Sequence, residues 1–227
     1  MLQNGMLNNI EGIIFDMDGT LVDSMWIWPA VDVDFFEKYD LVPPEHFHEG
    51  MEGMSYSETA QYFLDAFPKL TQSRQEVMDE WTQMAYEKYM TQVPLKKGVL
   101  EFIEEMRRQG KKIGIATSKG RELVDGTLNA LKIESLFDCV ITACEVGVGK
   151  PAPDVYLKAA SEIGIAPFRC LVFEDVPMGI LAGKNAGMKV CAVEDDFSKA
   201  QREKKRELAD YYIQDYNDIR SGKYEVL

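Results

Sequence analysis

Two aspartates follow a short apolar run and are separated by a single residue. Asp16 and Asp18 come directly after the β-branched run at residues 10–15, and Gly19 follows them. Side chains two positions apart in an extended segment point the same way, so both carboxylates can face one site, and Gly19 permits the turn that comes next. Clustered carboxylates repel each other, which raises one pKa or recruits a cation. The alternative is a polar turn that ends a strand.

Three further groups of reactive side chains occur later in the chain. Thr117 and Ser118 offer hydroxyls and backbone N–H groups to an anion, or else they cap the next helix. Lys150, in a proline-flanked loop, suits a phosphate oxygen, and a solvated lysine is the alternative. Glu174 and Asp175 offer the oxygen ligands that Mg²⁺ prefers, unless Asp175 caps a helix. Each group is weak evidence alone, and together they indicate one site.

The elements that must position these residues alternate between strands and helices after residue 94. We predict helices at residues 99–109, 122–131, 155–163 and 179–185, and strands at residues 10–15, 112–116, 139–142, 170–173, 189–193 and 211–213. Near-continuous apolar strands that alternate with helices are typical of a doubly wound parallel α/β sheet. Ligands bind at the carboxyl ends of such strands, where all four groups fall. Residues 221–227 are expected to form a frayed tail.

The first connection is much longer than a strand–helix–strand crossover requires. Asp16 and Thr117 are 101 positions apart, whereas such a unit needs only about 30 residues. The excess has aromatic and methionine positions at helical spacing. We therefore expect a core domain of residues 1–24 and 94–227, Rossmann-like in its winding, with a helical domain inserted at residues 25–93.

The order of these motifs resembles the haloacid dehalogenase superfamily. The run DMDGTLVDS at residues 16–24 is similar to its first motif, Thr117 with Ser118 to its second, Lys150 to its third, and residues 174–175 to its fourth. The resemblance covers the whole chain. The position of the insertion resembles the helical C1 cap of the β-phosphoglucomutase-like and phosphoglycolate-phosphatase-like subfamily. Asp18, which the resemblance implies is lacking in dehalogenases proper, favours phosphoryl transfer.

The resemblance implies a phosphoric monoester hydrolase that acts through an aspartyl phosphate. Asp16 would attack phosphorus, and Asp18 would protonate the leaving alcohol and later take a proton from water. Thr117 and Lys150 would complete the catalytic set and, with Ser118, bind the phosphate. The implied cofactor is Mg²⁺, held by Asp16, Asp18 through its backbone carbonyl, Glu174 and Asp175.

The inserted domain is expected to choose the substrate, a small phosphorylated metabolite. Its specificity loop, by resemblance, contains Met51, Glu52, Met54 and Tyr56, and Trp28 on the first helix of the insertion is a further candidate. Packing within the insertion is the alternative role for its aromatic residues.

Three other functions remain open from the sequence. A β-phosphoglucomutase-like transferase would carry a His and an Arg at about the places of Trp28 and Tyr56, which weakens that hypothesis. Phosphonate hydrolysis needs a lysine in the insertion, and Lys38 and Lys69 lie in no recognisable motif. A catalytically silent binding module conflicts with four intact motifs. His46 and His48 form a possible metal pair, although a solvated loop explains them better.

The overall charge restricts the partners. With 25 Lys and Arg against 38 Asp and Glu, the net charge is −13, so nucleic acids and anionic membranes should repel the chain. The sequence indicates no signal peptide and no membrane span. The four cysteines, Cys139, Cys144, Cys170 and Cys191, fit no zinc or disulfide spacing. We therefore expect a cytoplasmic protein, with a monomer as the default.

Overall fold

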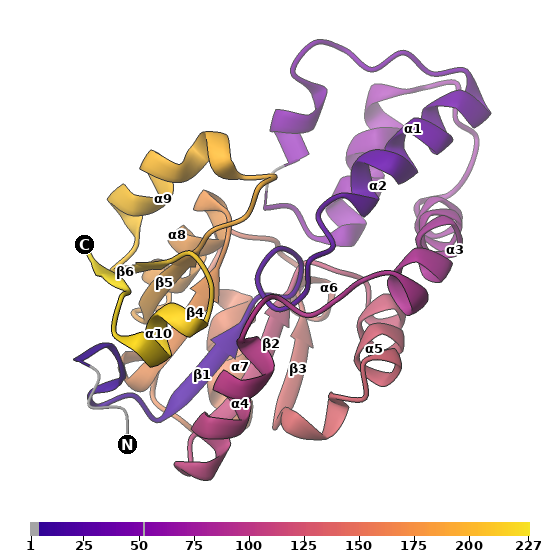
Figure 1. Ribbon diagram of the computed structural model, residues 1–227. Coiled ribbons are helices and arrows are strands. Elements are labelled where there is room, and N and C mark those ends of the chain that lie inside the picture. The colour runs from indigo at the N-terminus through magenta and orange to yellow at the C-terminus, as the bar shows by residue number, and fades with distance from the viewer. Residues whose placement is uncertain (1–4, 52) are drawn as a thin grey trace.

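The computed structural model describes residues 5–51 and 53–227, and its centre is a sheet of seven strands in the order β3-β2-β1-β4-β5-β6-β7 (Figure 1). Every neighbouring pair is parallel except the antiparallel pair β6–β7. The strands are β1 (Gly12–Phe15), β2 (Lys112–Thr117), β3 (Cys139–Thr142), β4 (Cys170–Glu174), β5 (Lys189–Val193), β6 (Tyr211–Ile213) and β7 (Glu225–Val226).

Helices cover both faces of the sheet. One face packs against α4 (Val99–Arg108), α5 (Arg121–Ala130) and α10 (Asn217–Ser221), and the other against α7 (Asp154–Ile163) and α8 (Pro177–Asn185). The short helices α6 (Ala143–Val146) and α9 (Arg202–Leu208) complete this part of the chain. This is the doubly wound α/β fold that the alternating pattern predicts.

The central strands are apolar on both sides because both sides are covered. Along β1, Ile13 and Phe15 belong to the larger core cluster, whereas Ile14 belongs to the smaller cluster under α7 and α8. All four residues of β1 are buried. A strand with two buried faces reads as a continuous apolar run instead of an alternating one, which is the pattern at residues 10–15.

The long connection between β1 and β2 forms a helical insertion. We use this name for the segment from α1 (Ile27–Tyr39) through the 3-10 helix at Phe47–Met51 and α2 (Tyr56–Ala66) to α3 (Arg74–Thr91). Capping boxes begin α2 and α3, since Ser55 and Ser73 bond to the third residue of each helix. Aromatic rings fill the interior of the insertion, with the Phe63 and Trp81 centroids 4.7 Å apart. The α/β fold with an inserted helical cap is thereby confirmed.

Two predictions at the ends of elements had different outcomes. The helix predicted at residues 155–163 ends where expected, because Gly164 is the C-cap of α7 with φ of +71°. The frayed tail at residues 221–227 was a wrong prediction, because β7 in this segment pairs with the free edge of β6. Among the described residues, no helix has both the length and the apolar composition needed to cross a membrane.

Candidate active site

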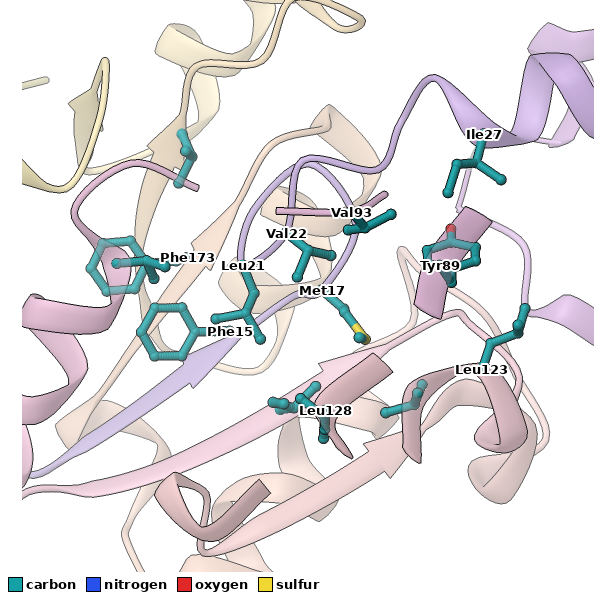
Figure 2. Packing of buried hydrophobic residues seen from close by; sticks show 14 of the residues in the cluster. Phe15, Met17, Leu21, Val22, Ile27, Tyr89, Val93, Leu123, Leu128 and Phe173 are labelled. Carbon is teal, nitrogen blue, oxygen red and sulfur yellow. The ribbon is translucent and has the colours of Figure 1, made fainter. Parts of the chain in front are cut away.

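The first motif forms a tight loop at the carboxyl end of β1. The backbone N–H of Asp16 donates to the Phe173 carbonyl at 3.0 Å, which extends the pairing of β1 with β4 by one residue. Gly19 has φ of +76°, and a side chain there would overlap the Asp175 carboxylate. Figure 2 shows Met17, Leu21 and Val22 of this loop in the same apolar cluster as Phe15. The loop thus turns its apolar residues inward and leaves the two aspartates at the strand end.

Lys150 joins the first motif to the fourth. Its buried Nζ donates to Asp16 Oδ1 at 2.6 Å and to Glu174 Oε1 at 2.5 Å. Burial raises the pKa of Asp16 to about 7, although the Lys150 charge opposes the rise. For Lys150 burial disfavours the charged form, but Asp16 and Glu174 outweigh burial and raise its pKa. The lysine therefore stays positively charged between two carboxylates.

Glu174 is completely buried, and protein donors occupy both of its oxygens. Oε1 accepts from Lys150 and from the Tyr156 hydroxyl at 2.6 Å. Oε2 accepts from the backbone N–H of Asp175 at 3.1 Å and from the backbone N–H of Val176 at 3.5 Å. This carboxylate is therefore fixed by its own neighbours, and it fixes Lys150 in turn.

The two carboxylate oxygens of Asp175 have different surroundings. Thr20 donates to Oδ1 at 3.0 Å, and Ser198 donates to the Asp175 carbonyl at 2.8 Å. Oδ2 is buried and has no hydrogen-bond partner within residues 5–51 and 53–227. Burial, with Glu174 and Asp16 adding to it, raises the pKa of Asp175 well above its ordinary value. Such a group needs either a proton or a cation.

The residues present therefore fit a divalent cation. Asp16, Glu174 and Asp175 each offer a ligand atom, and these atoms lie within 4.8 Å of one another. All three residues are buried. Carboxylate oxygens are the ligands of Mg²⁺. The unpartnered Asp175 Oδ2 is the observation that makes this more than an acidic cluster.

Thr117 and Ser118 lie at the end of β2, beside the same site. Thr117 is buried, and its hydroxyl accepts from the backbone N–H of Lys119 at 3.2 Å. The N-cap of α5 is Gly120, without a side-chain bond, so the explanation that Thr117 or Ser118 caps this helix was wrong. Asp175 likewise does not cap α8, whose N-cap is Val176.

Sequence reasoning missed two residues that contact Asp18. Lys119 Nζ lies 2.7 Å from Asp18 Oδ1, and its side chain is completely buried. The Tyr89 hydroxyl donates to the same oxygen at 3.0 Å. Lys119 directly follows the second motif, so its position could have suggested a role. Nothing in the sequence around Tyr89 sets it apart from other aromatic residues of the insertion.

The residues expected to determine substrate specificity differ in their burial and packing. Tyr56 is buried, and its hydroxyl contacts Thr82 at 3.2 Å. Trp28 is partly buried and packs on Tyr56 and Tyr89, with centroids 5.7 and 6.0 Å away. Packing thus accounts for these rings.

Two further groups of the insertion remain, the rest of the expected specificity loop and the histidine pair. Met51 and Met54 are partly buried, and Glu52 lies outside the described residues. His46 and His48 are exposed and contact Glu49 and Asp32 respectively, and they belong to no metal-ligand cluster in the described part of the chain.

Comparison with known families shows to which family the chain belongs. Residues 13–193 match the family model for haloacid dehalogenase-like hydrolases, and this range contains every polar residue of the site except Ser198. The chain belongs to this family.

Its relatives include enzymes with phosphatase names. A probable pseudouridine-5'-phosphatase of Drosophila melanogaster is 30% identical over 206 residues, 86% of each chain. Hexitol phosphatase B of Escherichia coli is 27% identical over 92% of this chain and 94% of its own. The crystal structure of β-phosphoglucomutase from Clostridium difficile superimposes with a TM-score of 0.77 over 92% of both chains at 20% identity, a likeness of fold.

Proposed function

We propose that this haloacid dehalogenase-like hydrolase is a Mg²⁺-dependent phosphatase that hydrolyses a small phosphorylated metabolite through an aspartyl phosphate. Its class, a phosphoric monoester hydrolase, agrees with the phosphatase relatives. The observation that carries the proposal is the buried Lys150 bound to Asp16, next to the unpartnered Oδ2 of Asp175. A cationic group on one side and a cation site on the other would neutralise a phosphoryl group in front of Asp16.

The residues of the chain would divide the reaction between them. Asp16 would form a bond to phosphorus as the bond to the leaving oxygen breaks, and Asp18 would give that oxygen its proton. Lys150 and Thr117, with Ser118, would bind the remaining phosphoryl oxygens. In the second step Asp18 would take a proton from the water that attacks the aspartyl phosphate, which restores Asp16 and releases phosphate.

Mg²⁺ would be held by Asp16, by the Asp18 backbone carbonyl and by Asp175, and when bound it supplies positive charge against the phosphoryl oxygens. Glu174 was expected among the ligands. Because four protein donors already surround its oxygens, we propose that it acts mainly by holding Lys150.

The insertion would act as a cap over this site. We propose the boundaries expected from the sequence, a core of residues 1–24 and 94–227 and a cap of residues 25–93. The contact between the Tyr56 N–H and the Ser118 carbonyl at 3.0 Å supports the role, because it joins the insertion to the second motif. The four cysteines are unpaired, which agrees with a reducing compartment such as the cytoplasm. The monomer stays a prediction.

The test is phosphate release across a panel of sugar, polyol, nucleotide and carboxylic-acid phosphates. We expect release that requires Mg²⁺, disappears in EDTA and falls at least about 1,000-fold in Asp16→Asn, because the nucleophile is lost. Glu162→Gln is the matched control for handling and charge, since this glutamate is exposed and pairs with Lys158.

Two outcomes would change the conclusion. Interconversion of hexose phosphates without free phosphate would establish the mutase alternative. If nothing turns over and Asp16→Asn binds ligands like the parent, the chain is a binding module.

A further inference from the structure

Within residues 5–51 and 53–227, the hydrogen bonds and the ion pair at the Asp18 carboxylate all involve one oxygen, Oδ1. Ser24 and Tyr89 both donate to Oδ1, and Lys119 Nζ lies 2.7 Å from the same atom. Among the residues that the structure describes, no hydrogen bond reaches Oδ2. A carboxylate oxygen has two lone-pair sites, so the two hydroxyl donors leave no room on Oδ1 for a proton of its own, and the Lys119 charge beside it disfavours a proton there further.

Tyr89 is a rigid member of this set. It is buried on α3, its ring lies 3.3 Å from Lys119 Nζ, and it packs on Trp28. The carboxylate accepts hydrogen bonds and a phenol is protonated at neutral pH, so the Tyr89 hydroxyl donates to Asp18. Figure 2 shows Tyr89 between Ile27 and Leu123, within the apolar cluster. The contacts of the ring with Lys119, Trp28 and this cluster therefore hold the hydroxyl in place.

The contact also joins two parts of the chain. Tyr89 belongs to the helical insertion, whereas Asp18, Ser24 and Lys119 belong to the core segments that flank the sheet. A residue of the insertion thus sets the orientation of a carboxylate of the first motif.

We propose that Tyr89 is a positioning residue for Asp18: together with Ser24 and Lys119 it fixes Oδ1, so that Oδ2 is the oxygen that carries the proton. This inference rests on the proposed function. As Asp16 bonds to phosphorus and the ester bond breaks, the proton on Oδ2 passes to the leaving oxygen. In the second step Oδ2 takes one proton from the attacking water, whose oxygen bonds to phosphorus as the bond from phosphorus to the Asp16 oxygen breaks, which releases phosphate and restores the Asp16 carboxylate. Tyr89 gives up no proton in either step.

Leaving-group dependence tests the proposal, because only a poor leaving group needs the proton. The variant is Tyr89→Phe, which keeps the ring and its packing. The substrates are p-nitrophenyl phosphate and the alkyl phosphate that the wild type hydrolyses fastest in the panel. Because hydrolysis of the aspartyl phosphate is common to both substrates, the quantity compared is kcat/KM, which reports only the steps up to departure of the leaving group. We expect kcat/KM to fall about tenfold for the alkyl phosphate and to stay within about twofold for p-nitrophenyl phosphate.

Three companion variants make the result decisive. Tyr212→Phe removes another buried phenol hydroxyl, one without a hydrogen-bond partner among the described residues, and should alter neither rate. Ser24→Ala removes the other hydroxyl donor to Asp18 Oδ1 and should slow the alkyl phosphate selectively, as Tyr89→Phe does. This variant keeps the proposal testable should Tyr89→Phe not fold. In an Asp18→Asn background, Tyr89→Phe should have no further effect on the alkyl phosphate.

Three results would overturn the assignment of Tyr89 and Oδ2. These are equal slowing of both substrates, no slowing of either, and a further loss in the Asp18→Asn background. Failure of the proposed function would look different, since the wild type would then release no Mg²⁺-dependent phosphate from either substrate.

Discussion

Asp16 keeps its proton to a higher pH than an ordinary aspartate, and this makes stability depend on pH. Burial raises its pKa to about 7 from 3.8, against the opposing charge of Lys150 and with Glu174 and Asp18 adding to the rise. Because the folded state binds the proton more tightly, the resulting stabilisation is fully present below about pH 4 and is lost as pH rises through about 7. We therefore expect the free energy of unfolding of Asp16→Asn to rise by about 2 kcal/mol relative to that of the parent between pH 5 and pH 8, without metal. Urea unfolding in EDTA at the two pH values measures this.

Metal is the control for that prediction. Mg²⁺ binds the ionised carboxylates, so it should raise the melting temperature of the parent more at pH 8 than at pH 5. If the parent and Asp16→Asn respond identically to pH and to Mg²⁺, Asp16 neither holds the proton nor contributes to the metal site.

The site could be predicted as far as strand ends determine it. Lys150 and the carboxylates come together because parallel strands place their carboxyl ends at one edge. The position of Lys119 after the second motif could have suggested a role, but its contact with Asp18, like that of Tyr89, could not be found in this way. Their importance depends on complete burial against Asp18, and burial is decided by how the insertion packs on the core, which no local pattern encodes. Tyr156 on Glu174 is a similar case.

At the scale of elements, α8 packs so closely on the site that its first turn needs a glycine. A side chain at Gly179 would overlap the Glu174 carboxylate, which is completely buried and holds Lys150. Gly179→Ala must therefore displace either Glu174 or the start of α8. We expect kcat to fall at least about tenfold and the free energy of unfolding to fall by about 2 kcal/mol, measured by phosphate release and urea unfolding.

Gly126 in α5 is the matched control. Its nearest neighbour is the methyl end of Met90, a flexible side chain that can move aside. Gly126→Ala should leave activity unchanged and raise the free energy of unfolding by about 0.5 to 1 kcal/mol, because glycine is unfavourable in a helix interior. Full activity in Gly179→Ala would mean that Glu174 does not need its observed position.

The elements of the core were predictable because near-continuous apolar strands alternate with helices along the sequence. Predicted strands 139–142, 189–193 and 211–213 have the observed bounds. The two-residue strand β7 was missed because its pairing depends on the free edge of β6, a tertiary feature. The helices α9 and α10 are too short for a clear period.

At the scale of the whole molecule, the insertion contacts the core where the backbones of the two lie directly against each other. A side chain at Gly149 would have its Cβ 2.5 Å from the Gly53 carbonyl oxygen and 2.6 Å from the Ser55 nitrogen. Tyr56 lies against Gly120 in the neighbouring loop, where an added Cβ would be 2.9 Å from the ring. Glycines on both sides thus allow the insertion to lie directly beside Lys150 and Ser118.

This contact leads to a prediction about domain arrangement. Because two of the three obstructing atoms are backbone, Gly149→Ala should hold the insertion away from the core, expose the site to water and separate the Tyr56–Ser118 contact. We expect kcat/KM to fall about tenfold and the radius of gyration from small-angle X-ray scattering to increase, while the free energy of unfolding changes by less than about 1 kcal/mol, since the cores on either side stay intact. A similar loss of activity at an unchanged radius of gyration would instead mean that the substitution displaces the adjacent Lys150, and the role of the glycine contact in closing the site would have to be abandoned.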